Sequence, residues 1–264
     1  NIMNDSNNRK GIYILPSLFT TAGLFFGFYA IIYGSRGVFD QAAVGILIAA
    51  VMDGLDGRVA RLTHTESQFG KEYDSLVDLV AFGLAPGLVV YFWSLQYLGK
   101  TGWLISFIFA AATALRLARF NTRDDDDKRF FTGLPSPSAA AFVTFWVWTM
   151  YEFEFDGASM AIFSGLITFF AALLMVSNVK YHSFKDFDVK KQVPFFAVIG
   201  LVLIFSLIYF EPRVLFLMAA GYALSGPIAW LFRYRKGKEK WENIIDDPDS
   251  EASDVQEEPE DPKA

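Results

Sequence analysis

The chain has 264 residues, of which 53% are hydrophobic and 17% aromatic, including 28 phenylalanines. These values exclude an ordinary soluble domain, because the apolar residues gather in runs long enough to cross a membrane. Residues 246–264 contain nine acids and one lysine. Their negative charge exceeds the net positive charge of the rest of the chain and gives the net charge of -6, so the acidity belongs to a tail. The absence of cysteine excludes disulfides and thiol chemistry.

Hydrophobic segments along the chain predict an all-α, polytopic membrane bundle of about eight transmembrane helices. Most segments hold about 20 residues, enough to cross ~30 Å of hydrocarbon. The first segment is too long for the apolar part of a signal peptide and lacks a small-residue cleavage site, so we expect it to be retained. In chain order the segments are 12–33, 39–62, 72–98, 101–121, 135–152, 158–177, 193–210 and 212–232.

These segments divide the chain into three parts. We expect residues 1–11 to form a cytoplasmic N-terminal segment and residues 12–232 to form one transmembrane domain. Residues 233–264 are first basic and then acidic, and their last part contains three prolines and few apolar residues. Such a composition cannot bury enough surface to offset the entropy of ordering, so we expect 233–264 to be a disordered cytoplasmic tail.

The basic residues predict how the bundle is oriented. With the segments above, 20 of the 23 Lys and Arg residues fall on one side of the membrane, and only Arg36, Lys100 and Arg213 fall on the other. Lys and Arg concentrate in cytoplasmic loops. We therefore expect both termini in the cytoplasm, together with the turn between the second and third segments.

That turn joins two segments that carry four aspartates: Asp53 and Asp56, then Asp74 and Asp78. The spacings of three and four residues place each pair on one face of its helix, and an antiparallel hairpin would bring both pairs to the same depth. Four facing carboxylates repel strongly without cations, and carboxylate oxygens suit Mg²⁺ or Mn²⁺. The sequence thus predicts a site for two divalent ions.

The aspartate face of the second segment also has room for a ligand. Gly57 and Ala60 share this face, and their small size lets a flat or phosphorylated ligand approach the backbone closely. Arg61 follows directly and can meet phosphate charge. Tight helix packing would explain the small residues equally well, but it would not explain two buried acids.

The full pattern is D-x-x-D-G-x-x-A-R, eight residues, then G-x-x-x-D-x-x-x-D, over residues 53–78. It resembles the signature of the CDP-alcohol phosphotransferase family at every position. The resemblance implies an integral membrane enzyme that joins a CDP-linked lipid or alcohol to a hydroxyl acceptor and releases CMP. It implies Asp53, Asp56, Asp74 and Asp78 as metal ligands, with Asp78 also the general base. It implies a CDP-binding surface formed by Asp56, Gly57, Ala60, Arg61, Gly70 and Thr20.

Other stretches are similar to those of bacterial membrane-type phosphatidylserine synthases: RKGIYILPSLFTTAG at 9–23, FFTGLPSPSAA at 130–140 and LMVSNVKYHSFKDFD at 174–188. Ser17 departs from the Asn expected there.

This resemblance implies CDP-diacylglycerol and L-serine as substrates, membrane lipids as surroundings, a homodimer, and a bacterial inner membrane with the active site facing the cytoplasm. Candidate residues for binding the acceptor or a phosphate, all on the same side, are Arg116, Arg119, Asn121, Ser136, Asn178 and Lys180.

Alternatives remain at this stage. Another acceptor, such as glycerol phosphate, inositol phosphate or choline, would fit the same family. An ion-coupled transporter would use buried aspartates as a relay, but these acids cluster at one membrane edge and not at the midplane. A non-catalytic lipid-binding protein would not need four acids. No feature indicates a nucleic-acid partner.

Overall fold

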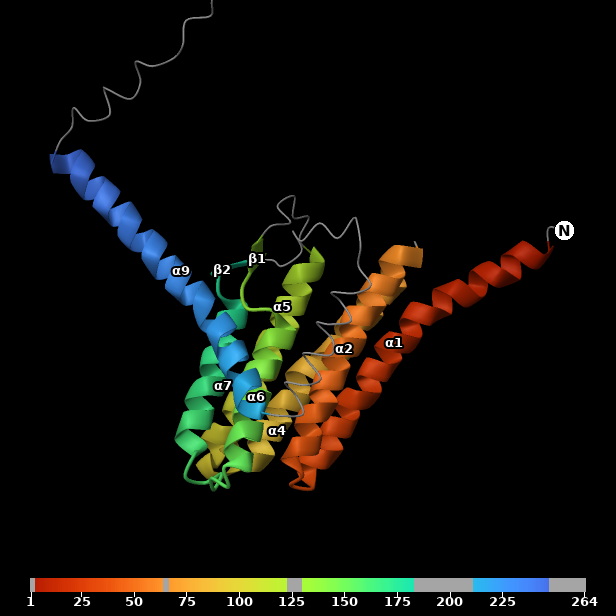
Figure 1. Cartoon of the computed structure of the whole chain (residues 1–264), viewed down its shortest axis with the longest axis horizontal. Helices are drawn as coiled ribbons and strands as arrows, with labels where there is room; N and C mark the ends of the chain where they lie inside the picture. The colour runs from red at the N-terminus through yellow and green to blue at the C-terminus, as the bar shows by residue number, and fades with distance from the viewer. Residues whose placement is uncertain (1–2, 64–66, 123–129, 183–210, 247–264) are drawn as a thin grey trace, which may run out of the picture.

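A computed structural model describes residues 3–63, 67–122, 130–182 and 211–246. These residues form a bundle of helices that stand side by side, with α1 and α2 at one side and α7 and α9 at the other (Figure 1). In chain order the elements are α1 (Met3–Ser35), α2 (Phe39–Thr63), α3 (Gln68–Asp78), η1 (Leu79–Leu84), α4 (Ala85–Trp93), η2 (Leu95–Leu98), α5 (Lys100–Thr122), β1 (Phe130–Thr132), α6 (Ser136–Glu152), α7 (Ala161–Val176), β2 (Lys180–His182) and α9 (Pro212–Asp246).

Within the described residues, four helical stretches are long and apolar enough to cross a membrane: Ser17–Ser35, Gln68–Trp93, Lys100–Thr122 and Pro212–Trp230. The helix α7 is apolar but shorter. Two more helices, α2 and α6, cover the expected segments 39–62 and 135–152. The helix α2 carries several charged residues, and α6 is largely buried by its neighbours. The expected segment 193–210 lies outside the described residues. The structure therefore supports a helical membrane protein, and the count of eight spans stays a prediction.

Small residues let α1 lie against the helices that carry the aspartates. A Cβ atom on Gly27 would come within 2.9 Å of Ala81 Cα in η1, so a larger residue would push the two helices apart. One helical turn earlier, Gly23 faces Val77 and Met52. The close approach of the helix backbones, typical of membrane bundles, brings Thr20 next to α2.

The helical stretch Gln68–Trp93, which covers most of the expected span 72–98, widens directly after Asp78. The stretch η1 is a π-helical turn, and the N–H of Ala85 donates to the carbonyl of Val80, five residues earlier. Pro86 has no N–H to donate to a carbonyl four residues earlier, so regular α-helical bonding cannot continue through this point. Such wide turns are frequent at functional sites. Here the turn lies immediately beyond the fourth aspartate.

The described chain is helical, as expected, apart from two strands of three residues each. β1 and β2 pair antiparallel, with Phe131 opposite Tyr181, and form a short ribbon over one end of the bundle. Gly133 follows β1 with a φ of +81°, and a Cβ there would clash with the carbonyl oxygen of Met175. Glycine is therefore needed where the chain passes from the ribbon into α6.

Both ends of the described chain are more helical than the sequence indicates. α1 begins at Met3 and not near residue 12, and α9 runs to Asp246, so disorder over residues 233–246 was the wrong expectation. The remaining tail, 247–264, lies outside the described residues. The N-terminal end of α1 and the C-terminal end of α9 both extend beyond the bundle on the side of the β1–β2 ribbon (Figure 1).

Candidate metal and substrate site

Three of the four aspartates meet at one point. Asp53 and Asp56 come from α2 and Asp74 from α3, and one carboxylate oxygen from each lies within 4.8 Å of the others. A Mg²⁺ ion holds its ligands at about 2.0–2.1 Å, so oxygens on opposite sides of one ion are ~4 Å apart. The three carboxylates are thus close to the geometry of a shared cation. This clustering agrees with the predicted hairpin.

Asp78 lines the same small cavity as the other three aspartates, together with Thr20, Gly23, Ala49, Val77, Ala81 and Phe82. The cavity has a volume of about 10 Å³, comparable to one water-sized occupant. The Oδ1 atom of Asp78 is buried and has no hydrogen-bond partner among the described residues. A buried carboxylate oxygen without a partner is costly, so the hard oxygen ligands here fit a divalent cation and a polar ligand.

Thr20 orients one of the metal-ligating candidates. Its Oγ1 donates a 2.7 Å hydrogen bond to Oδ2 of Asp56, and both side chains are buried. The bond joins α1 to α2 and occupies one oxygen of Asp56. Thr20 therefore acts on the carboxylate directly, although the sequence had grouped it with the nucleotide-binding residues.

The predicted CDP-binding surface lies along α2 beyond the aspartates. Among the described residues, the atoms within 4 Å of a Cβ added at Gly57 belong to the guanidinium of Arg61, with its Nη1 at 3.6 Å. Ala60 is half-buried and Arg61 is exposed, so this face is open to an incoming phosphate. Arg61 can close over such a ligand from one helical turn away.

Gly70 has a structural role at the start of α3. Its N–H donates to the Oγ of Ser67, which caps the helix, at 3.0 Å. An added Cβ would lie 3.1 Å from that oxygen, so a side chain would crowd the cap. The Ser67 cap was missed in the sequence, although a serine three residues before a helical backbone N–H is the usual N-cap signal. The cap fixes the register that carries Asp74.

The candidate acceptor residues pair across helices. Nη1 of Arg116 in α5 donates to Oγ of Ser136 in α6 at 2.9 Å, and Nη2 of Arg119 donates to Oδ1 of Asn178 at 2.6 Å. The Nε of Arg116 is buried without a partner among the described residues. One helical turn before Arg116, Thr113 lies close to Gly83 in η1, so α5 packs beside the turn that follows Asp78. Lys180 lies in β2.

Asn121 connects α5 to α3. Its Nδ2 donates to Oγ of Ser75 at 2.9 Å and lies 3.5 Å from Oε2 of Glu72, while its buried Oδ1 has no partner in the part of the chain that the structure describes. Sequence reasoning found Asn121 but not Ser75. Ser75 follows Asp74 in α3, and only its hydrogen bond with Asn121 in α5 shows which way its side chain points.

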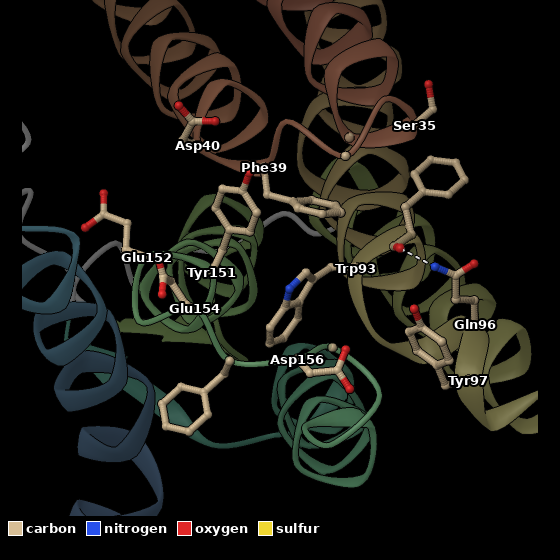
Figure 2. A pocket seen from close by; sticks show the side chains of 15 residues that line it. Ser35, Phe39, Asp40, Trp93, Gln96, Tyr97, Tyr151, Glu152, Glu154 and Asp156 are labelled. Atoms are coloured by element: carbon tan, nitrogen blue, oxygen red, sulfur yellow. Dashed lines mark hydrogen bonds between the residues drawn. The ribbon is translucent and has the colours of Figure 1, made fainter.

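A cavity of about 870 Å³ lies at the opposite end of the bundle. Figure 2 shows Asp40, Glu152, Glu154 and Asp156 around it, together with aromatic rings, among them that of Trp93. Asp40 precedes Asp53 by 13 residues along α2, a rise of about 20 Å. The cavity contains none of the predicted site residues, so the smaller aspartate cavity is the candidate site.

The chain matches the family model of CDP-alcohol phosphatidyltransferases over residues 13–177. It is 40% identical over 225 residues to the CDP-diacylglycerol–serine O-phosphatidyltransferase of Helicobacter pylori strain J99, covering 84% of this chain and 92% of that protein.

Two further relatives are more distant. The enzyme of the same name from Mycobacterium tuberculosis strain H37Rv is 39% identical over 140 residues, covering 50% of this chain and 49% of that protein. The archaetidylserine synthase of Methanothermobacter thermautotrophicus is 31% identical over 182 residues, covering 68% of this chain and 74% of that protein. The match over most of the bundle, with every signature aspartate in one cavity, shows that the chain belongs to the CDP-alcohol phosphatidyltransferase family.

Proposed function

We propose that the protein transfers the phosphatidyl group of CDP-diacylglycerol to the hydroxyl of L-serine, giving phosphatidylserine and CMP. The observation that carries this proposal is the similarity to a relative named for that reaction. The chain is 40% identical to that relative and covers 92% of the relative's length. The arrangement of the site supports it. A buried carboxylate oxygen of Asp78 and a buried Nε–H of Arg116 both lack partners among the described residues, and they suit an acceptor that brings a hydroxyl and a carboxylate.

The four aspartates would hold two divalent ions, Mg²⁺ or Mn²⁺. Asp53, Asp56 and Asp74 supply the clustered oxygens, and Asp78 extends the set. When bound, the ions neutralise the pyrophosphate of the lipid donor and the charge that develops on the leaving CMP. The hydrogen bond from Thr20 keeps Asp56 in one orientation for this role.

The nucleotide part of the donor would lie along α2. Gly57 and Ala60 leave space beside the backbone, and the exposed guanidinium of Arg61 provides donors for a phosphate. Gly70 holds the start of α3 in register and so supports this surface without touching the nucleotide. The lipid chains of the donor would extend sideways into the membrane.

Asp78 would be the general base. Its Oδ1 takes the proton of the serine hydroxyl, and the serine oxygen forms a bond to the β-phosphorus of CDP-diacylglycerol. The bond from that phosphorus to the bridging oxygen breaks, and the electron pair leaves with CMP. Arg116, supported by Ser136, would bind the serine carboxylate, which places the hydroxyl toward Asp78. Arg119, Asn178, Asn121 and Lys180 would border the acceptor side.

We further propose a cytoplasmic site in the inner membrane of a bacterium. The distribution of basic residues supports cytoplasmic termini, and the site lies at the end of the bundle from which α1 and α9 extend. Serine and CTP-derived nucleotides are cytoplasmic compounds, so this orientation suits the substrates. Eight spans and a homodimer follow from the apolar segments and from the family resemblance.

The test is CMP release by purified protein with CDP-diacylglycerol and Mn²⁺ or Mg²⁺. Serine should support release, whereas glycerol 3-phosphate, inositol phosphate and choline should not. A matched Asp78→Asn variant should release no CMP with serine. Release with glycerol 3-phosphate and not with serine would reject the serine acceptor while keeping the family chemistry. No CMP with any acceptor would reject the transferase.

A further inference from the structure

The helix α3 carries two of the four aspartates but buries little apolar surface. All eleven of its residues are described, and among them only Val77 is buried, whereas Phe69 and Leu76 are exposed. A helix is normally held in place by the apolar face that it packs against its neighbours. One buried side chain sets the rotation and height of α3 only weakly, so polar contacts with other helices help to decide where Asp74 lies.

A hydrogen bond from α5 supplies such a contact. The Nδ2 atom of Asn121 donates to the Oγ of Ser75 at 2.9 Å. Ser75 donates its own hydroxyl proton to the carbonyl of Lys71 at 3.1 Å, so toward Asn121 its oxygen can only accept. The amide of Asn121 therefore turns its NH2 group toward α3, where Oε2 of Glu72 lies 3.5 Å from the same nitrogen. Both acceptors belong to α3, so this one side chain ties the end of α5 to α3.

This tie acts on the residue next to Asp74. Ser75 directly follows Asp74, and consecutive Cα atoms are ~3.8 Å apart, so a displacement of Ser75 moves Asp74 with it. Among the described residues no hydrogen bond orients the carboxylate of Asp74 itself, whereas that of Asp56 accepts one from Thr20. The placement of the Asp74 carboxylate thus depends on the helix that carries it.

A metal site requires this placement to be accurate. Asp74 is the member of the oxygen cluster that comes from α3, while Asp53 and Asp56 come from α2, and the three oxygens lie within 4.8 Å of one another. Mg²⁺ demands near-octahedral ligands at about 2.0–2.1 Å. A misplacement of ~1 Å is enough to impair such a preorganised site. Whatever holds α3 against its neighbours therefore sets how well the third oxygen reaches an ion on α2.

We propose that Asn121 is a positioning residue of the metal site: through Ser75 it holds α3 where Asp74 can share a divalent ion with the aspartates of α2. The sequence grouped Asn121 with the acceptor candidates, and in this role it acts on the ions. The helix α5, which also carries Arg116, then links the acceptor side to the metal site. The inference rests on the proposed function in one respect, namely that Mg²⁺ or Mn²⁺ binds at the aspartates.

The test measures Mn²⁺ binding by the purified full chain at saturating CDP, by calorimetry and from the electron paramagnetic resonance signal of free Mn²⁺. Asn121→Ala and Ser75→Ala each remove one partner of the bond, and Ser75→Thr keeps the hydroxyl. Loss of a hydrogen bond between neutral groups corresponds to a change of about threefold to tenfold. We expect the Mn²⁺ affinity to fall by that factor in both alanine variants and to stay within about twofold of the parent value in Ser75→Thr.

The control is Thr122→Val at the end of the same helix. Thr122 is exposed, and its Oγ1 donates to the carbonyls of Ala118 and Arg119 within α5, so its loss should leave the Mn²⁺ affinity unchanged. An unchanged Mn²⁺ affinity in both alanine variants overturns the proposal. A lower melting temperature with fewer Mn²⁺ sites of parental affinity also overturns it, because the bond would then serve only to keep the protein folded.

A double-mutant cycle and serine kinetics identify what Asn121 acts on. The double variant of Asn121→Ala and Ser75→Ala should bind Mn²⁺ like either single variant, and additive losses contradict the proposal. At saturating Mn²⁺ the KM for serine should stay within about twofold of the parent value. A raised KM with unchanged Mn²⁺ affinity would instead assign Asn121 to the acceptor and sink the metal role.

The parent protein separates this inference from the proposed function. If it binds Mn²⁺ and CDP but releases CMP with no acceptor, the proposed transferase reaction fails, while the binding comparison still decides the role of Asn121. If it binds no Mn²⁺, the metal site and this positioning role fail together.

Discussion

The hydrogen bond from Thr20 to Asp56 allows a sharp test of the metal site. Thr20→Val keeps the shape of the side chain and removes only the hydroxyl that donates to Oδ2 at 2.7 Å. Thr21→Val is the matched control, because Thr21 is the next residue along α1 but contacts the Ser17 carbonyl and Tyr73 instead of an aspartate. Thr20→Ser retains the hydroxyl and should restore the parent behaviour.

The expected magnitude follows from the type of bond. A hydrogen bond to a charged group contributes about 1.5–3 kcal/mol, and 1.4 kcal/mol is a factor of ten in affinity. The bond is short and both side chains are buried, so solvent does not replace the lost donor. We therefore expect Thr20→Val to weaken the metal-dependent binding of CDP by about tenfold to a hundredfold.

Calorimetry of CDP binding in the presence of Mn²⁺ measures this effect directly. If Thr20→Val binds CDP as tightly as the parent protein, the hydrogen bond to Asp56 has no part in metal-dependent binding. If Thr20→Ser is as weak as Thr20→Val, the side-chain shape and not the hydroxyl is responsible. A similar loss in Thr21→Val would indicate a general disturbance of α1.

Four further predictions test the rest of the site and its placement. Asp78→Asn should abolish CMP release yet bind CDP-diacylglycerol measurably, because the amide keeps the shape but accepts no proton; normal turnover would remove Asp78 from the base role. Asp53→Ala should lose Mn²⁺-dependent CDP binding in calorimetry, and unchanged affinity would place the metals elsewhere. In intact cells an impermeant thiol reagent should label Asp156→Cys but not Ser250→Cys, and labelling of the latter alone would reverse the orientation. Removing 247–264 should leave the melting temperature and CMP release nearly unchanged, whereas loss of activity would show that the tail is not passive.

The donor side of the site could be predicted because its geometry is local. Residues three or four apart share a face of any helix, whatever the surrounding fold, so the two aspartate pairs could be placed from their spacing alone. The single assumption was that the second and third segments form a hairpin, and the clustering of Asp53, Asp56 and Asp74 confirms it. The same spacing rule could not anticipate the π-helical turn after Asp78, since its cause is a missing donor at Pro86 and not a periodic pattern.

Apolar periodicity also has a limit at the ends of the bundle. It marks where a helix is apolar, but not where its backbone hydrogen bonds stop. α9 therefore continues to Asp246 through residues whose charge suggested disorder. The β1–β2 ribbon carries no signal of its own, because strands of three residues are too short to show alternation.

The acceptor side could be predicted only as a group of residues on one membrane face, because its contacts join distant parts of the chain. Arg116 and Ser136 are 20 residues apart, and Arg119 and Asn178 are 59 residues apart. No spacing rule links such pairs; helix packing and the ribbon between β1 and β2 bring them together. On the proposed function, a change of acceptor can therefore arise from altered packing of α6 around Arg116 while the aspartate pattern stays intact. This is why one signature can identify the family of a chain and leave its acceptor open.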